Sequence, residues 1–204
     1  MIGIIDYGMG NLASVQNALN HLEVENKIIS DPTALKKCEK LILPGVGAFR
    51  DSMQNIHDSG MYETICQLVK EEKKPLLGIC LGMQVLFEAG QEDGYTPGFG
   101  FLKGQVIPMT NPSIRIPHIG WNQLEKAQDH PVFNNTSDRP FVYFVHSYYA
   151  SDMDSQDLLG YCHYGPYQIP GLVYHENVLG AQFHPEKSAE DGLKILKYFV
   201  EEFV

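Results

Sequence analysis

The stretch KPLLGICLGMQ, residues Lys74–Gln84, decides the fold. It opens as an apolar run typical of a buried strand and stops at Cys80, which has one glycine two residues before it and another two residues after it. The pattern predicts a strand, a tight turn at Cys80 and a helix that runs from Leu81 through Phe87. Such a corner is a nucleophile elbow, in which small flanking residues let neighbouring backbone crowd past a side chain held in a strained conformation.

Cys80 is a candidate nucleophile because of the two flanking glycines and the predicted turn. The elbow would place it at the carboxyl end of a sheet and at the amino terminus of a helix, whose partial positive charge favours the reactive thiolate. A cysteine is more often a small packing residue than a nucleophile, and the other three cysteines lack any activating context: Cys38, Cys66 and Cys162. We interpret Cys80 as reactive if a histidine base lies beside it.

The bulk composition narrows the class of protein. A chain of 204 residues, 44% hydrophobic and 20% charged, fits a single globular domain over residues 1–204. No basic leader or long apolar segment follows Met1, so we expect a cytoplasmic protein with no membrane span. The cysteine spacing indicates neither a zinc site nor a disulfide framework, and we expect no metal and no cofactor. A net charge of −10 argues against nucleic-acid binding, because such a surface repels phosphate.

Strand and helix patterns alternate along the first half of the chain. Apolar runs at Ile2–Asp6, Lys27–Ser30 and Lys40–Pro44 are separated by helical patterns, one of them starting after an Asp31 N-cap. This alternation predicts an α/β fold with an open, mostly parallel sheet and helices on both faces. Beyond about residue 95 glycine and proline are frequent and the strands are short, which predicts a mixed or antiparallel C-terminal half.

The third strand leads into a glycine-rich loop, PGVGAF, at Pro44–Phe49. In an open α/β sheet the ligand crevice lies outside the carboxyl ends of the strands, so this loop and Cys80 should face the same crevice. Its glycines leave the backbone free to aim an N–H into the site, and they make a peptide flip easy. Together with the N–H of Leu81 the loop would form an oxyanion hole, for which the candidates are Gly45, Val46 and Gly47. A plain left-handed turn explains the loop equally well when it is taken alone.

A histidine base is found near the end of the chain, in GAQFHPE at Gly180–Glu186. His184 closes an apolar strand and is therefore also placed at the crevice. Glu186 follows two residues later, the spacing that returns a side chain to the same side of an extended chain, so it can hold one imidazole nitrogen while the other faces Cys80. The zinc deaminases also contain His-x-Glu, but their Pro-Cys-x-x-Cys companion is absent here. A final helix is expected over Ser188–Val204, with Ser188 as its N-cap.

These motifs resemble the triad, or class I, glutamine amidotransferases. Further motifs narrow the resemblance to the glutaminase subunits that serve histidine biosynthesis, and together they span nearly the whole chain: Ile5–Asn11, Pro44–Phe49, Pro117–Asn122, Tyr143–Tyr148 and Gln182–Ser188. Glutaminases serving anthranilate, aminodeoxychorismate or pyridoxal phosphate synthesis share the triad and remain alternatives. So do a cysteine peptidase or a DJ-1-like cysteine hydrolase, which would leave Gln84 unexplained, and a non-catalytic flavodoxin-like interaction subunit.

The resemblance implies a flavodoxin-like class I amidotransferase fold and the hydrolysis of glutamine to glutamate and ammonia by a triad of Cys80, His184 and Glu186. It also implies a set of substrate-binding residues: Gly82, Gln84, Glu92, Ser147 and Tyr148. The run Gly90–Glu92 departs from the family's usual Ser-Glu-Glu-like sequence, and the resemblance assigns Glu92 to the substrate amino group.

The resemblance further implies a partner, a (βα)8-barrel cyclase subunit in a heterodimer. The cyclase would use the ammonia to convert a phosphoribulosyl-formimino ribonucleotide into imidazole glycerol phosphate and an aminoimidazole carboxamide ribonucleotide. The partner is expected at the crevice mouth, against Asn11, Trp121 and Asn122. A half-buried structural role explains the single tryptophan equally well from its sequence context.

Overall fold

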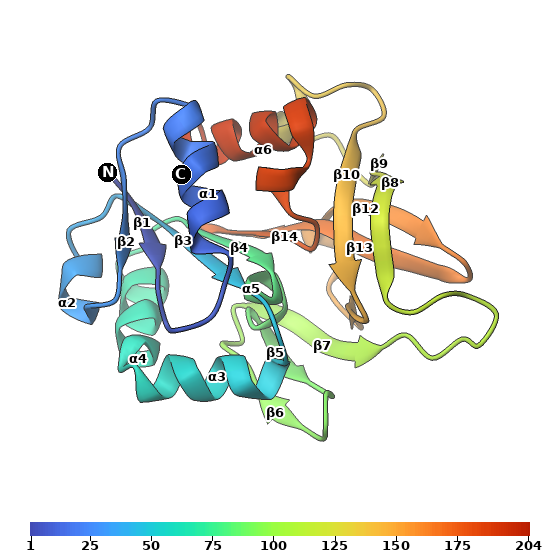
Figure 1. Ribbon diagram of the computed structural model, residues 1–204, viewed down its shortest axis with the longest axis horizontal. Helices are drawn as coiled ribbons and strands as arrows, with labels where there is room; N and C mark the ends of the chain where they lie inside the picture. The colour runs from blue at the N-terminus through green and yellow to red at the C-terminus, as the bar shows by residue number, and fades with distance from the viewer.

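An eight-stranded sheet with the order β2-β1-β3-β4-β14-β13-β12-β9 runs through the computed structural model, which describes residues 1–204 (Figure 1). Five of its strands are parallel: β1 (Ile2–Ile5), β2 (Asn26–Ile29), β3 (Lys40–Gly45), β4 (Leu76–Cys80) and β14 (Val178–Ala181). The other three are antiparallel: β13 (Tyr167–His175), β12 (Leu158–Tyr164) and β9 (Glu125–Lys126). The predicted open, mostly parallel sheet is therefore confirmed.

Helices cover both faces of the parallel strands (Figure 1). One face carries α1 (Leu12–His21) and α6 (Ala189–Glu201), and the other carries α3 (Phe49–Asp58) and α4 (Met61–Cys66), which continues as a π-helix over Gln67–Glu71. A short helix, α2 (Pro32–Leu35), begins as predicted, with the Asp31 side chain accepting a hydrogen bond from the N–H of Thr33.

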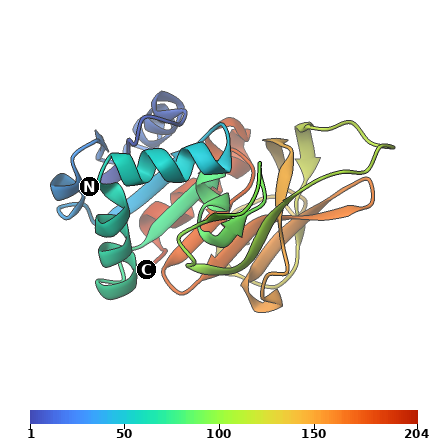
Figure 2. The same ribbon diagram turned by 90° about the horizontal axis from the view of Figure 1, so that it is seen from below.

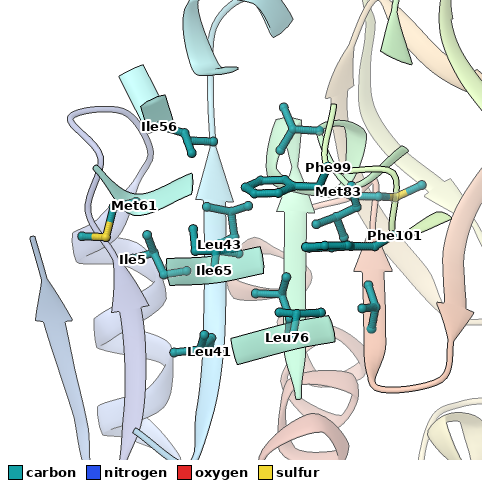
Figure 3. Packing of buried hydrophobic residues seen from close by; sticks show 14 of the residues in the cluster. Ile5, Leu41, Leu43, Ile56, Met61, Ile65, Leu76, Met83, Phe99 and Phe101 are labelled. Atoms are coloured by element: carbon teal, nitrogen blue, oxygen red, sulfur yellow. The ribbon is translucent and has the colours of Figure 1, made fainter. Parts of the chain in front are cut away.

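The strands are apolar on both sides because both sides are covered. Leu41 and Leu43 of β3 pack with Ile56 and Ile65 from the helices α3 and α4 (Figure 3). Ile42, which lies between those two leucines, faces the opposite core with residues of α1 and α6. The period of two along a strand thus divides one apolar run between two cores.

Two smaller sheets gather at the end of the molecule away from the N-terminus (Figure 2). A four-stranded sheet has the order β11-β7-β5-β6, formed by β11 (Tyr148–Ser151), β7 (Leu102–Pro108), β5 (Phe87–Gly90) and β6 (Thr96–Pro97). A two-stranded antiparallel ribbon pairs β8 (His118–Gln123) with β10 (Phe141–His146). Short 3₁₀ turns connect other elements at Pro131–Phe133, Ser155–Asp157 and Pro185–Lys187. The prediction of a mixed, β-rich second half is confirmed.

Two local predictions were wrong. The helix after Cys80 is only α5 (Leu81–Gln84), because the carbonyl groups of Val85 and Leu86 accept hydrogen bonds from the N–H groups of Phe99 and Phe101 and the chain then enters β5. Ser188 precedes α6, but its hydroxyl does not cap that helix. It donates instead to the carbonyl of His184 at 2.6 Å and accepts from the N–H of Tyr143 at 2.9 Å.

The helices are also too short, or too polar, for any of them to cross a bilayer.

Candidate active site

Cys80 stands at the carboxyl end of β4 with a strained backbone, φ 56° and ψ −112°. A positive φ is rare for a residue with a side chain and marks a position that the surrounding structure forces. The flanking glycines make the turn possible, since a Cβ added at Gly78 would lie 2.6 Å from the carbonyl oxygen of Gly82. The strained turn predicted from the sequence is therefore confirmed.

The helix that follows contributes less to the electrostatics than expected. With four residues, α5 is about one turn long, so the field at its amino terminus is much weaker than that of a full helix. The group beside Cys80 that can take a proton from the sulfur is His184, which lines the same pocket.

His184 and Glu186 form a buried pair. Nδ1 of His184 lies 2.8 Å from Oε1 of Glu186, and the two side chains are only 3% and 1% exposed. The carboxylate accepts the hydrogen from Nδ1, so the imidazole presents Nε2 as its reactive nitrogen. Both Nε2 of His184 and Oε2 of Glu186 are buried without a hydrogen-bond partner. Nε2 is thus left available beside the sulfur.

The environment of His184 favours its protonated form. Burial lowers the pKa of the imidazole, but the interactions with Cys80 and with the Glu186 carboxylate raise it by more, to about 9. At neutral pH the imidazole is therefore charged, which suits a proton donor and stabilises a thiolate next to it.

Cys80 and His184 line one pocket of about 320 Å³, a volume suited to a small polar ligand. Seven other residues predicted for the site also line it: Val46, Gly47, Leu81, Gln84, Glu92, Ser147 and Tyr148. Three lining residues were not predicted: Pro117, Val145 and His146. Neither in this pocket nor elsewhere in the chain is a group of three or more His, Cys, Asp and Glu side chains arranged to hold a metal ion.

Gly45 and Gly82 do not line the pocket, although they were predicted for the oxyanion hole and for substrate binding. A Cβ on Gly82 would lie 1.8 Å from the carbonyl oxygen of Leu43, and one on Gly45 would lie 2.6 Å from the nitrogen of Gly82. These two glycines let the end of β3 and the start of α5 pass each other at close range. Their geometry indicates a packing requirement.

Gln84 and Glu92 reach the pocket with part of their polar groups already used. The amide nitrogen of Gln84 donates to the carbonyl of Tyr148 and to Oε1 of Gln182, both at 3.0 Å, which leaves its oxygen for a ligand. Oε2 of Glu92 accepts from the N–H of Phe49 at 2.7 Å, at the first turn of α3. Both side chains can therefore act toward a ligand only as hydrogen-bond acceptors or, for Glu92, as a negative charge.

Sequence reasoning missed a fully buried glutamine beside the sulfur. Nε2 of Gln182 lies 3.9 Å from Sγ of Cys80, and the carbonyl oxygen of Val145 lies 3.8 Å from the same sulfur. A signal was present, since Gln182 is a polar residue in an apolar run and precedes His184 by two, the spacing that returns a side chain to the same side of an extended chain.

Two buried histidines extend the polar interior from the pocket lining, where His146 lies, to His118. Nδ1 of His146 donates to the carbonyl of Tyr148 at 2.9 Å, so its Nε2 accepts from Nδ1 of His118 at 3.0 Å. Nε2 of His118 in turn accepts from the amide of Asn122 at 3.3 Å. This order of donors requires both imidazoles to be neutral. Burial lowers the pKa of His118 to about 4 and that of His146 to about 3, which agrees with neutral rings.

The predicted partner-contact residues differ in their surroundings. Trp121 is more than half exposed and meets Tyr143 edge to face. Asn122 instead turns inward, and its amide also donates to the carbonyl of His163 at 2.9 Å. Asn11 precedes α1, makes no capping hydrogen bond with its side chain and is partly exposed.

Comparison with known proteins identifies the class. Residues 3–203 match the family model of the class-I glutamine amidotransferases, and the chain belongs to that family. A solved glutamine amidotransferase crystal structure superposes with a TM-score of 0.77 at 22% identity, over 98% of this chain and 97% of that one, which shows the shared fold.

Relatives of higher sequence identity narrow the assignment within this family. Imidazole glycerol phosphate synthase subunit HisH from Lactococcus lactis is 49% identical over 98% of this chain and 98% of its own length. The subunit of the same name from Sulfurimonas denitrificans is 45% identical over 98% and 97%. The chain belongs to the family of these HisH subunits.

Proposed function

We propose that the chain is the glutaminase subunit of an imidazole glycerol phosphate synthase and hydrolyses glutamine to glutamate and ammonia for a cyclase partner. The observation that carries the proposal is the meeting of Cys80, on a strained turn, with the buried His184–Glu186 pair in one pocket. The identity of 45–49% to HisH subunits favours this pathway over those of anthranilate, aminodeoxychorismate or pyridoxal phosphate. The whole chain acts as one amidotransferase domain in the cytoplasm.

The first half-reaction releases ammonia. The sulfur of Cys80, as a thiolate, attacks the side-chain carbonyl carbon of glutamine, and the carbonyl electrons move onto oxygen. His184, which carries the proton, gives it from Nε2 to the departing nitrogen. The C–N bond breaks, ammonia leaves, and a glutamyl thioester on Cys80 remains. A protonated imidazole with a pKa raised to about 9 is the form that this step needs at neutral pH.

The second half-reaction frees the enzyme. His184, now neutral, accepts a proton from water as the water oxygen attacks the thioester carbon. The C–S bond then breaks, glutamate departs, and the thiolate and imidazolium are restored. Glu186 takes no part in proton transfer but holds the imidazole so that Nε2 faces the sulfur throughout.

The negative oxygen of each tetrahedral intermediate requires hydrogen-bond donors. Leu81, Val46 and Gly47 line the pocket next to Cys80, and their backbone N–H groups are the candidates. Gly47 has a φ of +100°, a conformation that a glycine adopts without strain. The loop can therefore present its peptide groups toward the pocket or away from it at little steric cost.

The substrate amino-acid group occupies the rest of the pocket. The free oxygen of Gln84 and the carboxylate of Glu92 can accept hydrogen bonds from a substrate ammonium, and Ser147 and Tyr148 also line the pocket. This arrangement favours free glutamine over a peptide, whose nitrogen carries no positive charge. It therefore argues against a cysteine peptidase.

The cyclase partner docks on the outer face of the β8–β10 ribbon. Three large apolar side chains on this face are more than half exposed: Ile119, Trp121 and Phe141. They alternate with less exposed residues along the two paired strands, so they share one surface, and Val145 of the same ribbon lines the pocket. An exposed apolar face next to the pocket mouth is suited to a lasting protein contact. Ammonia would pass from the pocket into that partner.

Coupling between the two subunits follows from the loop at Gly45–Gly47. A free subunit that hydrolysed glutamine steadily would waste substrate and ammonia. We therefore expect the loop to rest in a state that lacks the oxyanion N–H until the partner and its ligand stabilise the competent state. A 100-fold activation would correspond to about 2.7 kcal/mol, within the usual range of allosteric coupling.

The test measures steady-state glutamate release by the subunit alone, with the cyclase, and with the cyclase plus an acceptor analogue. We expect a low rate, a higher rate and the highest rate in that order, with no release of amino acids from glutamine-containing peptides. Equal rates in all three would remove the coupling. An absence of glutaminase activity in every case would leave a non-catalytic subunit as the better description.

A further inference from the structure

The side chain of Gln182 is the only amide that reaches the sulfur of Cys80. It is fully buried on the chain between β14 and His184, and its backbone N–H is fixed to the carbonyl of Gly171 at 2.9 Å. A buried primary amide needs partners for its oxygen and its nitrogen. Gln182 has one partner on each side, Gln84 and Cys80.

The orientation of this amide is dictated by its neighbours. The carbonyl oxygen of Tyr148 can only accept, so the group of Gln84 that lies 3.0 Å from it is the NH₂. The same nitrogen lies 3.0 Å from the amide of Gln182, which must therefore present its oxygen there. Rotating Gln182 by half a turn would set two NH₂ groups against each other. The NH₂ of Gln182 consequently faces the sulfur.

The sulfur thus lies between a donor and an acceptor. The carbonyl of Val145, at 3.8 Å, favours the protonated thiol because only S–H can donate to it. The NH₂ of Gln182, at 3.9 Å, favours the thiolate because a charged sulfur accepts this hydrogen bond more strongly than a neutral thiol does. Without Gln182, the uncharged groups around the sulfur would favour the thiol.

We propose that Gln182 is a further catalytic residue, which donates a hydrogen bond from its side-chain amide to Sγ of Cys80 and stabilises the thiolate. The inference rests on the proposed role of Cys80 as the nucleophile. The hydrogen bond acts twice in each turnover, before the sulfur attacks and again when the sulfur leaves the thioester. The amide gives up no proton and stays neutral throughout, so the proton balance with His184 is unchanged.

The test is alkylation of the free full-length chain by iodoacetamide, in which the thiolate forms a C–S bond and iodide leaves. The rate at Cys80 is followed by mass spectrometry of its peptide across pH. Gln182→Met keeps the length of the side chain but removes the amide. We expect alkylation of Cys80 about tenfold slower than in the wild type at pH 7, and equal to it at the alkaline plateau where the thiol is fully ionised. Gln182→Glu, which sets a carboxylate against the sulfur, should react more slowly still.

Two controls separate this effect from loosened packing. Gln67→Met makes the same substitution at an exposed glutamine and should leave the rate unchanged. Cys66, which is half-buried, reports in each sample on opening of the fold. Equal rates at pH 7 for the wild type and a folded Gln182→Met would overturn the proposal.

Should Gln182→Met open the fold, Gln84→Met decides the matter, because it keeps Gln182 but removes the N–H that orients it. A smaller fall in the Cys80 rate is expected there, and no fall would overturn the proposal. The assay uses neither glutamine nor a partner, so its failure leaves the proposed function standing. Glutamine hydrolysis by Cys80→Ala would instead overturn the proposed function while the alkylation results of the other variants stood.

Discussion

Gly45 lies directly opposite Cys80 in the parallel pairing of β3 with β4. The last residue of one strand and the strained residue of the next therefore stand at the same height on the carboxyl edge of the sheet. The loop that follows Gly45 and the turn at Cys80 then open into one pocket. This register, and not the loop sequence alone, brings the candidate oxyanion donors to the nucleophile.

Substitution of the two loop glycines should have different effects. A Cβ at Gly45 would meet the nitrogen of Gly82 and the hydroxyl of Tyr7 at 2.6 and 2.9 Å, so Gly45→Ala should lower the free energy of unfolding by about 1–3 kcal/mol. At Gly47 the nearest atom is the flexible end of Met9, but φ is +100°. Gly47→Ala should therefore strain the loop and lower kcat with a smaller loss of stability. Urea unfolding and glutaminase assays of both variants measure this, and a Gly47→Ala variant with wild-type kcat would contradict it.

Much of the site could be predicted from the sequence because its signals are local. The glycines on either side of Cys80 and the His-x-Glu spacing at His184 lie within a few residues of the groups they position. Local patterns therefore predicted both groups, although Glu186 meets His184 across a 3₁₀ turn at Pro185–Lys187 and not along the extended chain that was expected. The alternation of apolar strands and helical patterns predicts the parallel sheet in the same way.

The features that could not be predicted from the sequence depend on contacts with residues far away in the chain. The early end of α5 comes from N–H groups of Phe99 and Phe101, which no pattern near residue 85 indicates. The place of Gln182 depends on contacts with Gln84 and Cys80, 98 and 102 residues away in the chain. Ser188 was predicted as an N-cap from its neighbours, but the closeness of Tyr143 gives its hydroxyl a different partner.

Cys80→Ser should abolish glutaminase activity. A serine hydroxyl has a much higher pKa than a thiol, and a protonated imidazole beside it cannot accept its proton. Fold and partner binding should be kept, since the oxygen occupies nearly the same space. The cyclase supplied with ammonium salt at alkaline pH should still form product with this variant. The matched control is Cys66→Ser, which changes a half-buried cysteine remote from the pocket lining and should leave both activities intact. Substantial glutamine hydrolysis by Cys80→Ser would rule out the proposed nucleophile.

Glu186→Gln should reduce glutaminase activity less than His184→Ala. Loss of the orienting carboxylate costs about 10⁴ in kcat in the serine-protease triad, and a cysteine that is already partly ionised should depend on it less. The variant should also lower the pKa of His184 from about 9, because the carboxylate is one of the groups that raise it. Nuclear magnetic resonance titration of the imidazole measures that shift. Equal losses of activity in the two variants would assign Glu186 a direct part in the chemistry.

Trp121→Ala should weaken binding of the cyclase with little change in the basal glutaminase rate. A large, exposed aromatic side chain at the centre of an apolar face is typical of an interface hot spot, whose truncation costs about 2 kcal/mol or more, roughly 30-fold in Kd. The control is Tyr95→Ala, which removes another exposed aromatic ring, in the segment between β5 and β6 and not on the β8–β10 ribbon. Titration calorimetry compares the two. Equal affinities for Trp121→Ala and the wild type would move the docking face elsewhere.

The two buried, neutral histidines, His118 and His146, should make stability depend on pH in a predictable direction. The folded-state pKa values of His118 and His146, about 4 and about 3, lie below the value of about 6.5 for an unfolded chain. Below pH 6.5 the unfolded chain therefore binds more protons than the folded one. The stability that these rings contribute is fully present above pH 6.5 and is lost as the pH falls toward 4 and then 3.

His118→Gln tests this dependence, because glutamine can both donate and accept a hydrogen bond but cannot be protonated in this range. The free energy of unfolding of the wild type should fall from pH 6.5 to 4, and that of the variant should fall less steeply, by at most about 1.36 kcal/mol per pH unit for the one proton removed. The variant will be less stable at pH 7, since glutamine does not reproduce the stacking of His118 on Phe144 and Tyr164. The slope with pH and not the absolute stability is therefore the observable. His21→Gln, at an exposed position, serves as the control and should keep the wild-type slope. Urea unfolding at each pH gives the values, and identical slopes for His118→Gln and the wild type would show that His118 is protonated in the fold or does not titrate there.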